Sequence, residues 1–403
     1  MPVTILHTVC EMESVARERP HVAAPGPRWV TFGLLCAAYF ATTTGEQMLS
    51  PLFPVVSDDL GLSVTQGGIA FAVLTATIAA TNLVGGDAVR HATPRTIVRL
   101  ACLAGVAGSL INALTSTYAV LLVGQVLLGA AAGLFFPVGL QGVAAAAGPA
   151  KRGFAMGIYG VAFSGGLLAA ALLGTLGAAA SWRLPFWLAA GLFVAAGAAI
   201  GFADLGPRVA GPRGKFPLRE VMSLPTYVGT VLATLQYGAI PFLTTYAVAR
   251  WGISAAEAAT VLVIGRLVSI VAKVIGGASA DRIGAKASGR RTAIVLTATG
   301  LAWVLLPGNL VTYGIAAIYA GAVSSLGPVA NMLAVERFGG NGLALGTYRS
   351  VQIGLGALAS AIVGVVAGLV GLRPTLTVAG LVPLALLWIC RESADGARPP
   401  VTT

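Results

Sequence analysis

Apolar residues fill this chain in a series of long runs, and polar residues gather in short stretches between them. Each run holds about 20 residues, the length that an α-helix needs to cross the hydrocarbon core of a bilayer. Twelve such runs predict an all-α membrane protein with twelve transmembrane helices, over residues 29–56, 65–86, 96–114, 118–146, 153–178, 184–203, 224–249, 256–278, 292–310, 312–335, 346–371 and 374–390.

Basic residues are distributed unevenly over the connections between these runs. Twenty Lys and Arg residues, Arg349 among them, fall in one set of alternate connections and tails, and three, Arg183, Arg250 and Arg373, fall in the other. Because Lys and Arg are retained on the cytoplasmic side of a membrane, this bias predicts that both termini are cytoplasmic. We expect a disordered cytoplasmic tail over residues 1–27 and a second cytoplasmic tail over 392–403.

The order of runs divides into two similar halves. A helix preceded by Leu-Gly-Leu-Ser at 60–63 and followed by a Gly-rich segment at 85–90 recurs about 190 residues later, between 251–254 and 277–284. A Pro- and Gly-rich basic segment separates the halves. We therefore expect two pseudo-symmetric six-helix bundles around a central cavity, over 28–203 and 224–391, joined by a cytoplasmic linker over 204–223. Many secondary transporters are built from such repeats.

Composition restricts the function further. The chain is 57% hydrophobic and 10% charged, with a mean hydropathy of +0.87, whereas soluble domains contain about a quarter charged residues. Its net charge of +11 does not indicate nucleic-acid binding, because the basic residues lie at the ends of apolar runs rather than in one stripe. The four cysteines lack metal-ligand spacing, and no nucleophile–base pair or phosphate-binding loop is evident. We expect no enzyme activity and no cofactor.

A motif after the eighth run carries a family resemblance. The segment 277–284, Gly-Ala-Ser-Ala-Asp-Arg-Ile-Gly, resembles the G-x-x-x-D-R-x-G signature of the major facilitator superfamily, which lies in the loops after helices 2 and 8. The resemblance covers about residues 28–391 and implies a monomeric transporter that works by alternating access. The compact loops and the Ala- and Gly-rich composition favour the inner (plasma) membrane as its location. It also implies a gate in which charged groups at a helix end pair with a neighbouring helix, formed by Arg90, Gly277, Asp281, Arg282 and Gly284.

Other segments match this family in part. In the first half Val89 stands where the signature has Asp, although Arg90 is retained. Gln125 stands where the helix 4 pattern R-x-x-Q-G of many proton-driven members has Arg. Segment 157–166 keeps the outer glycines of an exporter pattern in helix 5 but not its Gly-Pro centre. Segment 45–51 of helix 1 is loosely similar to drug/proton antiporters, which also place an acid and a proline here.

Three ionisable residues lie well inside the predicted spans: Glu46, Arg266 and Lys273. A charge at the bilayer centre costs about 2.5–3.5 kcal/mol, so each is a candidate for function. Glu46, the buried carboxylate, is the candidate proton-coupling site, with a structural ion pair as the alternative. Arg266 has three interpretations: it pairs with Glu46 in one state, it binds an anionic substrate, or it stabilises helix packing. Lys273 is also close enough to one surface to extend its amine into water.

Uncharged polar residues in mid-helix complete the list of substrate-binding candidates, where hydrogen bonding between helices is the alternative role. They are Gln47, Gln125, Gln236, Tyr237 and Asn331. The function we favour from the sequence is proton-coupled export of small amphipathic molecules, such as a drug or a metabolite. The alternative is proton-coupled uptake of a small organic anion or other metabolite, which the cations Arg266 and Lys273 favour. The expected partners are a small-molecule substrate, protons and the lipid bilayer.

Overall fold

The computed structural model describes residues 28–88, 91–147, 152–205, 217–338 and 342–391, and these ranges contain helices and no strand. The first half comprises α2 (Trp29–Gln47), α3 (Leu49–Leu60), α4 (Val64–Ala88), α5 (Pro94–Leu114), α6 (Tyr118–Ala147), α7 (Arg152–Ala179), α8 (Leu184–Ala199) and η2 (Ile200–Phe202). The second half comprises α9 (Leu218–Val221), α10 (Leu224–Ala233), η3 (Thr234–Ala239), η4 (Ile240–Phe242), α11 (Leu243–Trp251), α12 (Ala255–Ile283), α13 (Ala285–Leu305), α14 (Leu310–Ala322), η5 (Val323–Ser325), α15 (Leu326–Phe338), α16 (Gly342–Val370), α17 (Leu372–Leu381), η6 (Val382–Leu384) and α18 (Ala385–Ile389).

Several of these elements are pieces of one membrane crossing. Ten helices of the described ranges are long and apolar enough to span a bilayer. Four of these spans combine several labelled elements: Leu184–Phe202, Leu224–Trp251, Leu310–Phe338 and Leu372–Ile389. The two further crossings are the interrupted pair α2–α3 and the more polar α13. The twelve-helix prediction is therefore confirmed for the described residues.

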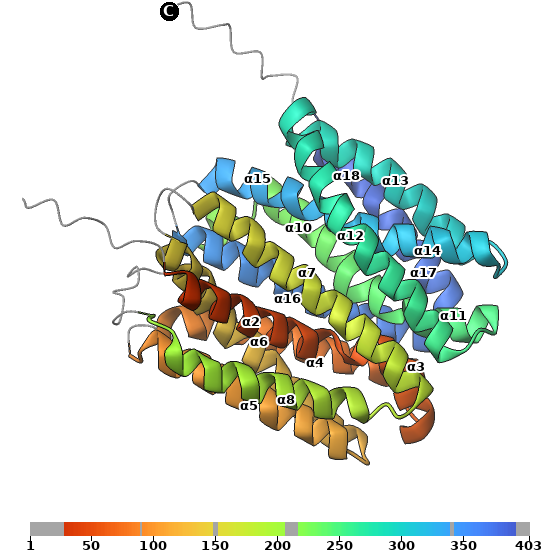
Figure 1. The fold of residues 1–403 in the computed structure, drawn as a ribbon. Coiled ribbons are helices and arrows are strands. Elements are labelled where there is room, and N and C mark those ends of the chain that lie inside the picture. Colours follow the sequence, from red (N-terminus) through yellow and green to blue (C-terminus); the bar gives the residue numbers. More distant parts are fainter. Residues whose placement is uncertain (1–27, 89–90, 148–151, 206–216, 339–341, 392–403) are drawn as a thin grey trace, which may run out of the picture.

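The two halves lie side by side with their helices roughly aligned (Figure 1), the red-to-green half against the green-to-blue half. Between them α4 packs on α16, and α7 packs on α12. These are the second crossing of one half against the fifth of the other, in both directions, as expected for a pair of related bundles. Residues on the facing sides of these two helix pairs therefore contact the opposite half.

One predicted span is displaced. The helix expected over 292–310 is α13, which begins at Ala285 and ends at Leu305. It begins there because Gly284, with φ +83°, ends α12 immediately before it, and the basic residues assigned to a connection lie in its first turns. The predicted break at 306–309 is confirmed, since Leu306 is extended and Asn309 caps α14 by accepting a hydrogen bond from the Thr312 N–H at 2.9 Å.

Some expected features lie outside the described residues. These are the two tails, 1–27 and 392–403, the gate residue Arg90, and most of the 204–223 linker. Of that linker the structure describes its two ends, including the single turn α9.

α4 and α16 approach each other closely at Gly68 and Gly364. A Cβ on Gly364 would lie 2.5 Å from the Gly68 Cα, closer than real Cβ contacts come. We therefore expect Gly364→Ala to force the helices apart and to lower stability by about 1–3 kcal/mol, measured by thermal unfolding in detergent. The matched control is Gly354→Ala on the same helix, where the nearest atom is the Ala79 Cβ at 3.9 Å. Equal stability of the two variants would contradict this account.

Candidate functional site

The first crossing is interrupted at Met48, between α2 and α3. Pro51 and Pro54 follow closely, and a proline has no N–H to donate to the carbonyl four residues before it. The carbonyl of Ser50, four residues before Pro54, instead accepts a hydrogen bond from Thr244 Oγ1 of α11 at 3.0 Å. Thr244 of the opposite half thus supplies the hydrogen-bond donor that Pro54 lacks.

Glu46 and Gln47 end α2 beside this interruption, and both are half-buried. Gln47 Nε2 donates a hydrogen bond to Glu46 Oε1 at 2.9 Å. Gln47 Oε1 accepts one from Arg266 Nη2 of α12 at 3.4 Å. The structure therefore brings three sequence candidates together, with the Gln47 amide bridging Glu46 and Arg266, which form no direct ion pair within the described part of the chain.

Arg266 and Lys273 lie on one face of α12, because seven residues make nearly two full turns, about 10 Å along the helix axis. Arg266 is 3% exposed, and its Nε has no hydrogen-bond partner among the described residues. Lys273 is half-buried, and its Nζ donates a hydrogen bond to Ser164 Oγ of α7 at 2.8 Å. The same Nζ lies 5.0 Å from the centroid of the Phe163 ring. Both cations therefore contact the first half.

Arg349, expected in a cytoplasmic connection, is instead a third interior cation. It lies on α16, half-buried, and its Nη1 donates a hydrogen bond to Gln352 Oε1 at 2.8 Å. Its Cζ lies 5.8 Å from the centroid of the Phe136 ring in the first half. Its charge acts on Glu46 and on Lys273. The sequence already indicated an interior position for Arg349, because residue 349 falls inside the predicted span 346–371.

Tyr237 joins this cluster from η3, a π-helical turn in the seventh crossing. Its ring packs where a Cβ on Gly356 would lie, and its hydroxyl interacts electrostatically with Glu46, Arg349 and Arg266. A π-helical turn inserts one extra residue into a helix and is frequent at functional sites. Gln236, the adjacent residue in the same turn, is half-buried and forms no side-chain hydrogen bond with the described residues.

Two other sequence candidates do not join the cluster. Gln125 is buried in α6 at 1% exposure, and neither of its amide atoms has a hydrogen-bond partner within the described ranges. Asn331 is exposed on α15 and takes part in none of the side-chain hydrogen bonds of the described chain. Their roles in substrate binding stay predictions.

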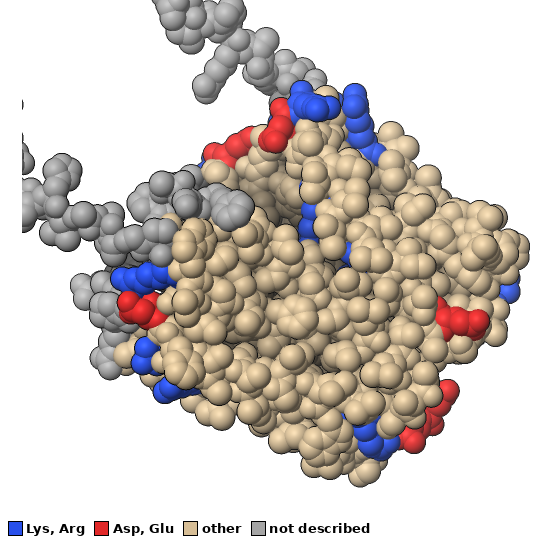
Figure 2. Space-filling view, viewed as in Figure 1, with Lys and Arg blue, Asp and Glu red and all other residues tan. Residues whose placement is uncertain are grey.

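Aromatic rings of the first half line the side opposite these cations. Tyr39 of α2 stacks on Tyr159 of α7 with centroids 4.2 Å apart, and it lies 5.5 Å from Phe163. Phe135 and Phe136 of α6 extend the same cluster. The interior between the halves is therefore aromatic on one side and cationic on the other. Figure 2 shows a largely tan surface with charges gathered toward its ends, and a few blue atoms in a hollow beside the path of α12.

The predicted gate residues on α12 lie toward its C-terminal end, while Arg90 is outside the described residues. Asp281 and Arg282 are exposed in the last turn of α12 and form no ion pair with the residues that the structure describes. Gly284 adopts φ +83° and ends the helix, and a Cβ on Gly277 would come no closer than 3.8 Å to Pro328. A gating role for these residues stays a prediction.

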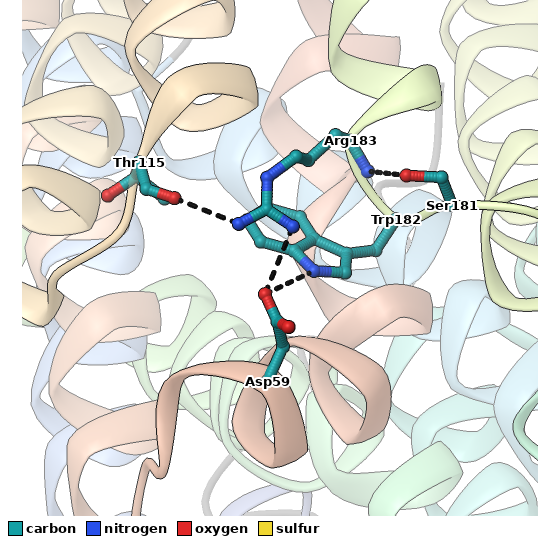
Figure 3. A network of polar contacts seen from close by, with 5 residues as sticks. All are labelled: Asp59, Thr115, Ser181, Trp182 and Arg183. Carbon is teal, nitrogen blue, oxygen red and sulfur yellow. Dashed lines mark hydrogen bonds and ion pairs between the residues drawn. The ribbon is translucent and has the colours of Figure 1, made fainter.

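A second polar network lies where α3 ends (Figure 3). Asp59 Oδ2 accepts hydrogen bonds from Trp182 Nε1 and from Arg183 Nη1, both at 3.0 Å. Arg183 Nη2 also donates to the carbonyl of Thr115 at 3.2 Å, and its Cζ lies 4.1 Å from the Trp182 ring centroid. The network thus ties the end of α3 to the α5–α6 and α7–α8 connections.

Asp59→Asn is expected to destabilise the protein only above acidic pH. The hydrogen bond from Trp182, and then that from Arg183, hold the pKa of Asp59 below its usual value. A lowered folded-state pKa means that the stabilisation is complete above the usual carboxyl pKa of about 4 and is lost as pH falls through the folded-state value. We expect a melting temperature about 1–2 °C lower at pH 7.

Thermal unfolding of Asp59→Asn between pH 7 and pH 3 measures this effect. The matched control is Asp58→Asn, the exposed neighbour without this network. A difference from wild type that does not shrink as the pH falls would show that the Asp59 charge is not its source.

Comparison with known proteins gives a family and a relative. Residues 35–361 match the model of the Major Facilitator Superfamily. The chain is 27% identical over 161 residues to the "Probable sulfoacetate transporter SauU" of Cupriavidus necator. That match covers 40% of this chain and 37% of the relative, so the chain spans little more than a third of that protein's length.

Solved structures share the fold at low sequence identity. A bacterial homologue of the human lysosomal transporter Spinster, in an inward-facing and unoccupied conformation, matches with a TM-score of 0.76 at 14% identity, over 90% of this chain and 96% of that one. The human organic anion transporter MFSD10 (TETRAN) matches with a TM-score of 0.67 at 18% identity, over 91% of this chain and 100% of that one.

Proposed function

This chain belongs to the major facilitator superfamily and is a membrane transporter, and we propose that it carries a small organic anion by alternating access. The observation that supports an anion is Arg266, a guanidinium at 3% exposure whose one side-chain partner among the described residues is the neutral Gln47 amide. Burying a charge without a counter-charge is unfavourable, so the site favours a ligand that supplies one. The relative named for sulfoacetate, a small organic anion, agrees with this class.

We propose Glu46 as the proton-coupling residue of this carrier. Its carboxylate accepts the hydrogen bond of Gln47, whose other amide atom accepts the hydrogen bond of Arg266. A proton on Glu46 removes the negative charge near Arg266 and so increases the attraction of this arginine for an anion. Proton binding and anion binding then favour each other, as transport of both together requires.

A second candidate function is the proton-coupled export of amphipathic molecules that the sequence favoured. The aromatic cluster of Tyr39, Phe136, Tyr159 and Phe163 supports it, since stacked rings suit an apolar ligand. We give it second place because Lys273 and Arg349 lie over Phe163 and Phe136, so that an entering apolar ligand would meet two cations.

The membrane placement follows from the basic residues. We propose an inner-membrane protein with both termini cytoplasmic, working as a monomer, in which the segments 28–203 and 224–391 move against each other. Single cysteines introduced at the exposed positions Arg373 and Arg282 test this orientation in intact cells. A membrane-impermeant reagent is expected to label the cysteine at position 373 and not the one at position 282.

A binding panel decides between the two functions. Purified protein in detergent is titrated with small carboxylates and sulfonates, lipophilic cations and neutral drugs, and the midpoint of thermal unfolding is recorded. We expect that anions raise the midpoint, because a ligand that binds the folded state stabilises it. If lipophilic cations or neutral compounds alone raise it, export of amphipathic molecules replaces the anion proposal.

A further inference from the structure

We propose that the substrate is a dianion, with one negative group bound by Arg266 and the other by Lys273 and Arg349. This inference rests on the proposed anion transport and narrows its substrate class. Its first support is the charge of the interior. Among the described residues, the hydrogen-bond partners of the three cations are neutral: the Gln47 amide, the Ser164 hydroxyl and the Gln352 amide.

Glu46 is the one carboxylate of the described residues within this cluster. When it is ionised, it balances one of the three cations, and when it is protonated, as in the proposed coupling, it balances none. In either state at least two positive charges are uncompensated, and a monoanion leaves at least one of them without a counter-charge in a low-dielectric interior, which is unfavourable. A dianion neutralises two of them, so the charge of the site favours two negative groups over one.

The spacing of the cations supports two separate binding positions. Arg266 and Lys273 lie about 10 Å apart along one face of α12, and their charges act on each other. The two side chains are long and can incline toward one ligand, so that each cation can meet a different negative group of a small dianion. Arg349 reaches the same region from α16, where its charge acts on Lys273.

The hydrogen-bond partners of Arg266 and Lys273 indicate how a dianion would affect the contacts between the two halves. Arg266 is tied to the first half at Gln47 of α2, and Lys273 is tied to it at Ser164 of α7. A ligand with two negative groups competes with both ties at once, whereas a monoanion competes with one. Occupancy by a dianion therefore loosens two contacts between the halves, and rearrangement of the halves is the step that alternating access needs.

The test compares dianions with monoanions of similar size. Malonate, succinate and sulfoacetate are titrated by calorimetry against propionate, butyrate and methanesulfonate, at one pH and ionic strength, with wild type and Lys273→Gln. We expect dianions to bind wild type at least about tenfold more tightly than the monoanions. Lys273→Gln is expected to remove that preference and to leave monoanion affinity within about twofold, and Lys273→Arg to restore the preference.

The control is Lys286→Gln on α13, which removes a lysine remote from the cluster, and thermal unfolding verifies that each variant is folded. Equal affinity for dianions and monoanions in wild type, with Lys273→Gln changing neither, would overturn this inference and leave anion transport standing. A protein that binds no anion of either kind would overturn the proposed function and this inference together.

Discussion

Arg266→Gln is expected to weaken anion binding about a hundredfold and to reduce transport below detection. The guanidinium is buried and charged, and removal of one charged partner from a buried polar contact costs about 2–5 kcal/mol, which corresponds to a factor of about 30 or more. Gln keeps an amide that can still bond to Gln47, so the change removes the charge while much of the local packing remains. The measurement is the dissociation constant of the tightest anion, together with its uptake into proteoliposomes.

The matched control is Arg373→Gln, which removes an exposed arginine at the start of α17. Its affinity for the anion is expected to stay within about twofold of wild type. If Arg266→Gln binds the anion as wild type does and differs only in its melting temperature, Arg266 serves helix packing and the anion site lies elsewhere.

Glu46→Gln is expected to reduce the accumulation of substrate driven by a pH gradient at least about tenfold. Exchange of substrate across the membrane is expected to continue. Gln has nearly the shape of Glu and keeps an acceptor for the Gln47 amide, but it cannot bind the proton that is carried together with the substrate. Proteoliposomes with an imposed pH gradient measure accumulation, and counterflow without a gradient measures exchange.

Glu257→Gln is the control for this variant, because Glu257 is an exposed acid that caps the start of α12 and Gln retains the capping hydrogen bonds. Unchanged accumulation by Glu46→Gln would move proton coupling to another residue. Loss of exchange as well as accumulation would make Glu46 part of substrate binding.

The crossings were predictable because a bilayer demands about 20 apolar residues for each helix, and that demand is visible in any single sequence. The start of α13 was not, because charged residues such as Lys286 were read as a connection although they continue a helix beyond its apolar part. Arg349 was missed for a related reason. Its basic character suggested a surface, whereas a helix that faces the other half can carry a charge inside the protein.

The contact between Glu46 and Gln47 was also beyond the sequence. Neighbouring side chains on a regular helix point about 100° apart and do not face each other. At the end of α2, before the interruption at Met48, these two side chains do meet, and Gln47 also reaches α12. Which face of a helix points inward, as for Gln125 and Asn331, depends likewise on packing that residue types alone do not specify.

The interruption at Met48 divides the first crossing into two helical segments that are connected by a joint. α2 packs within its own half, on α6, α7 and α8, while α3 is also fastened to the other half through Ser50, which bonds to Pro241 and Thr244. A swing of one half against the other therefore turns the joint. Glu46 lies directly beside this joint. If it carries the coupled proton as proposed, a swing of the halves is expected to change the access of water to its carboxylate, so that proton binding and release are linked to the movement.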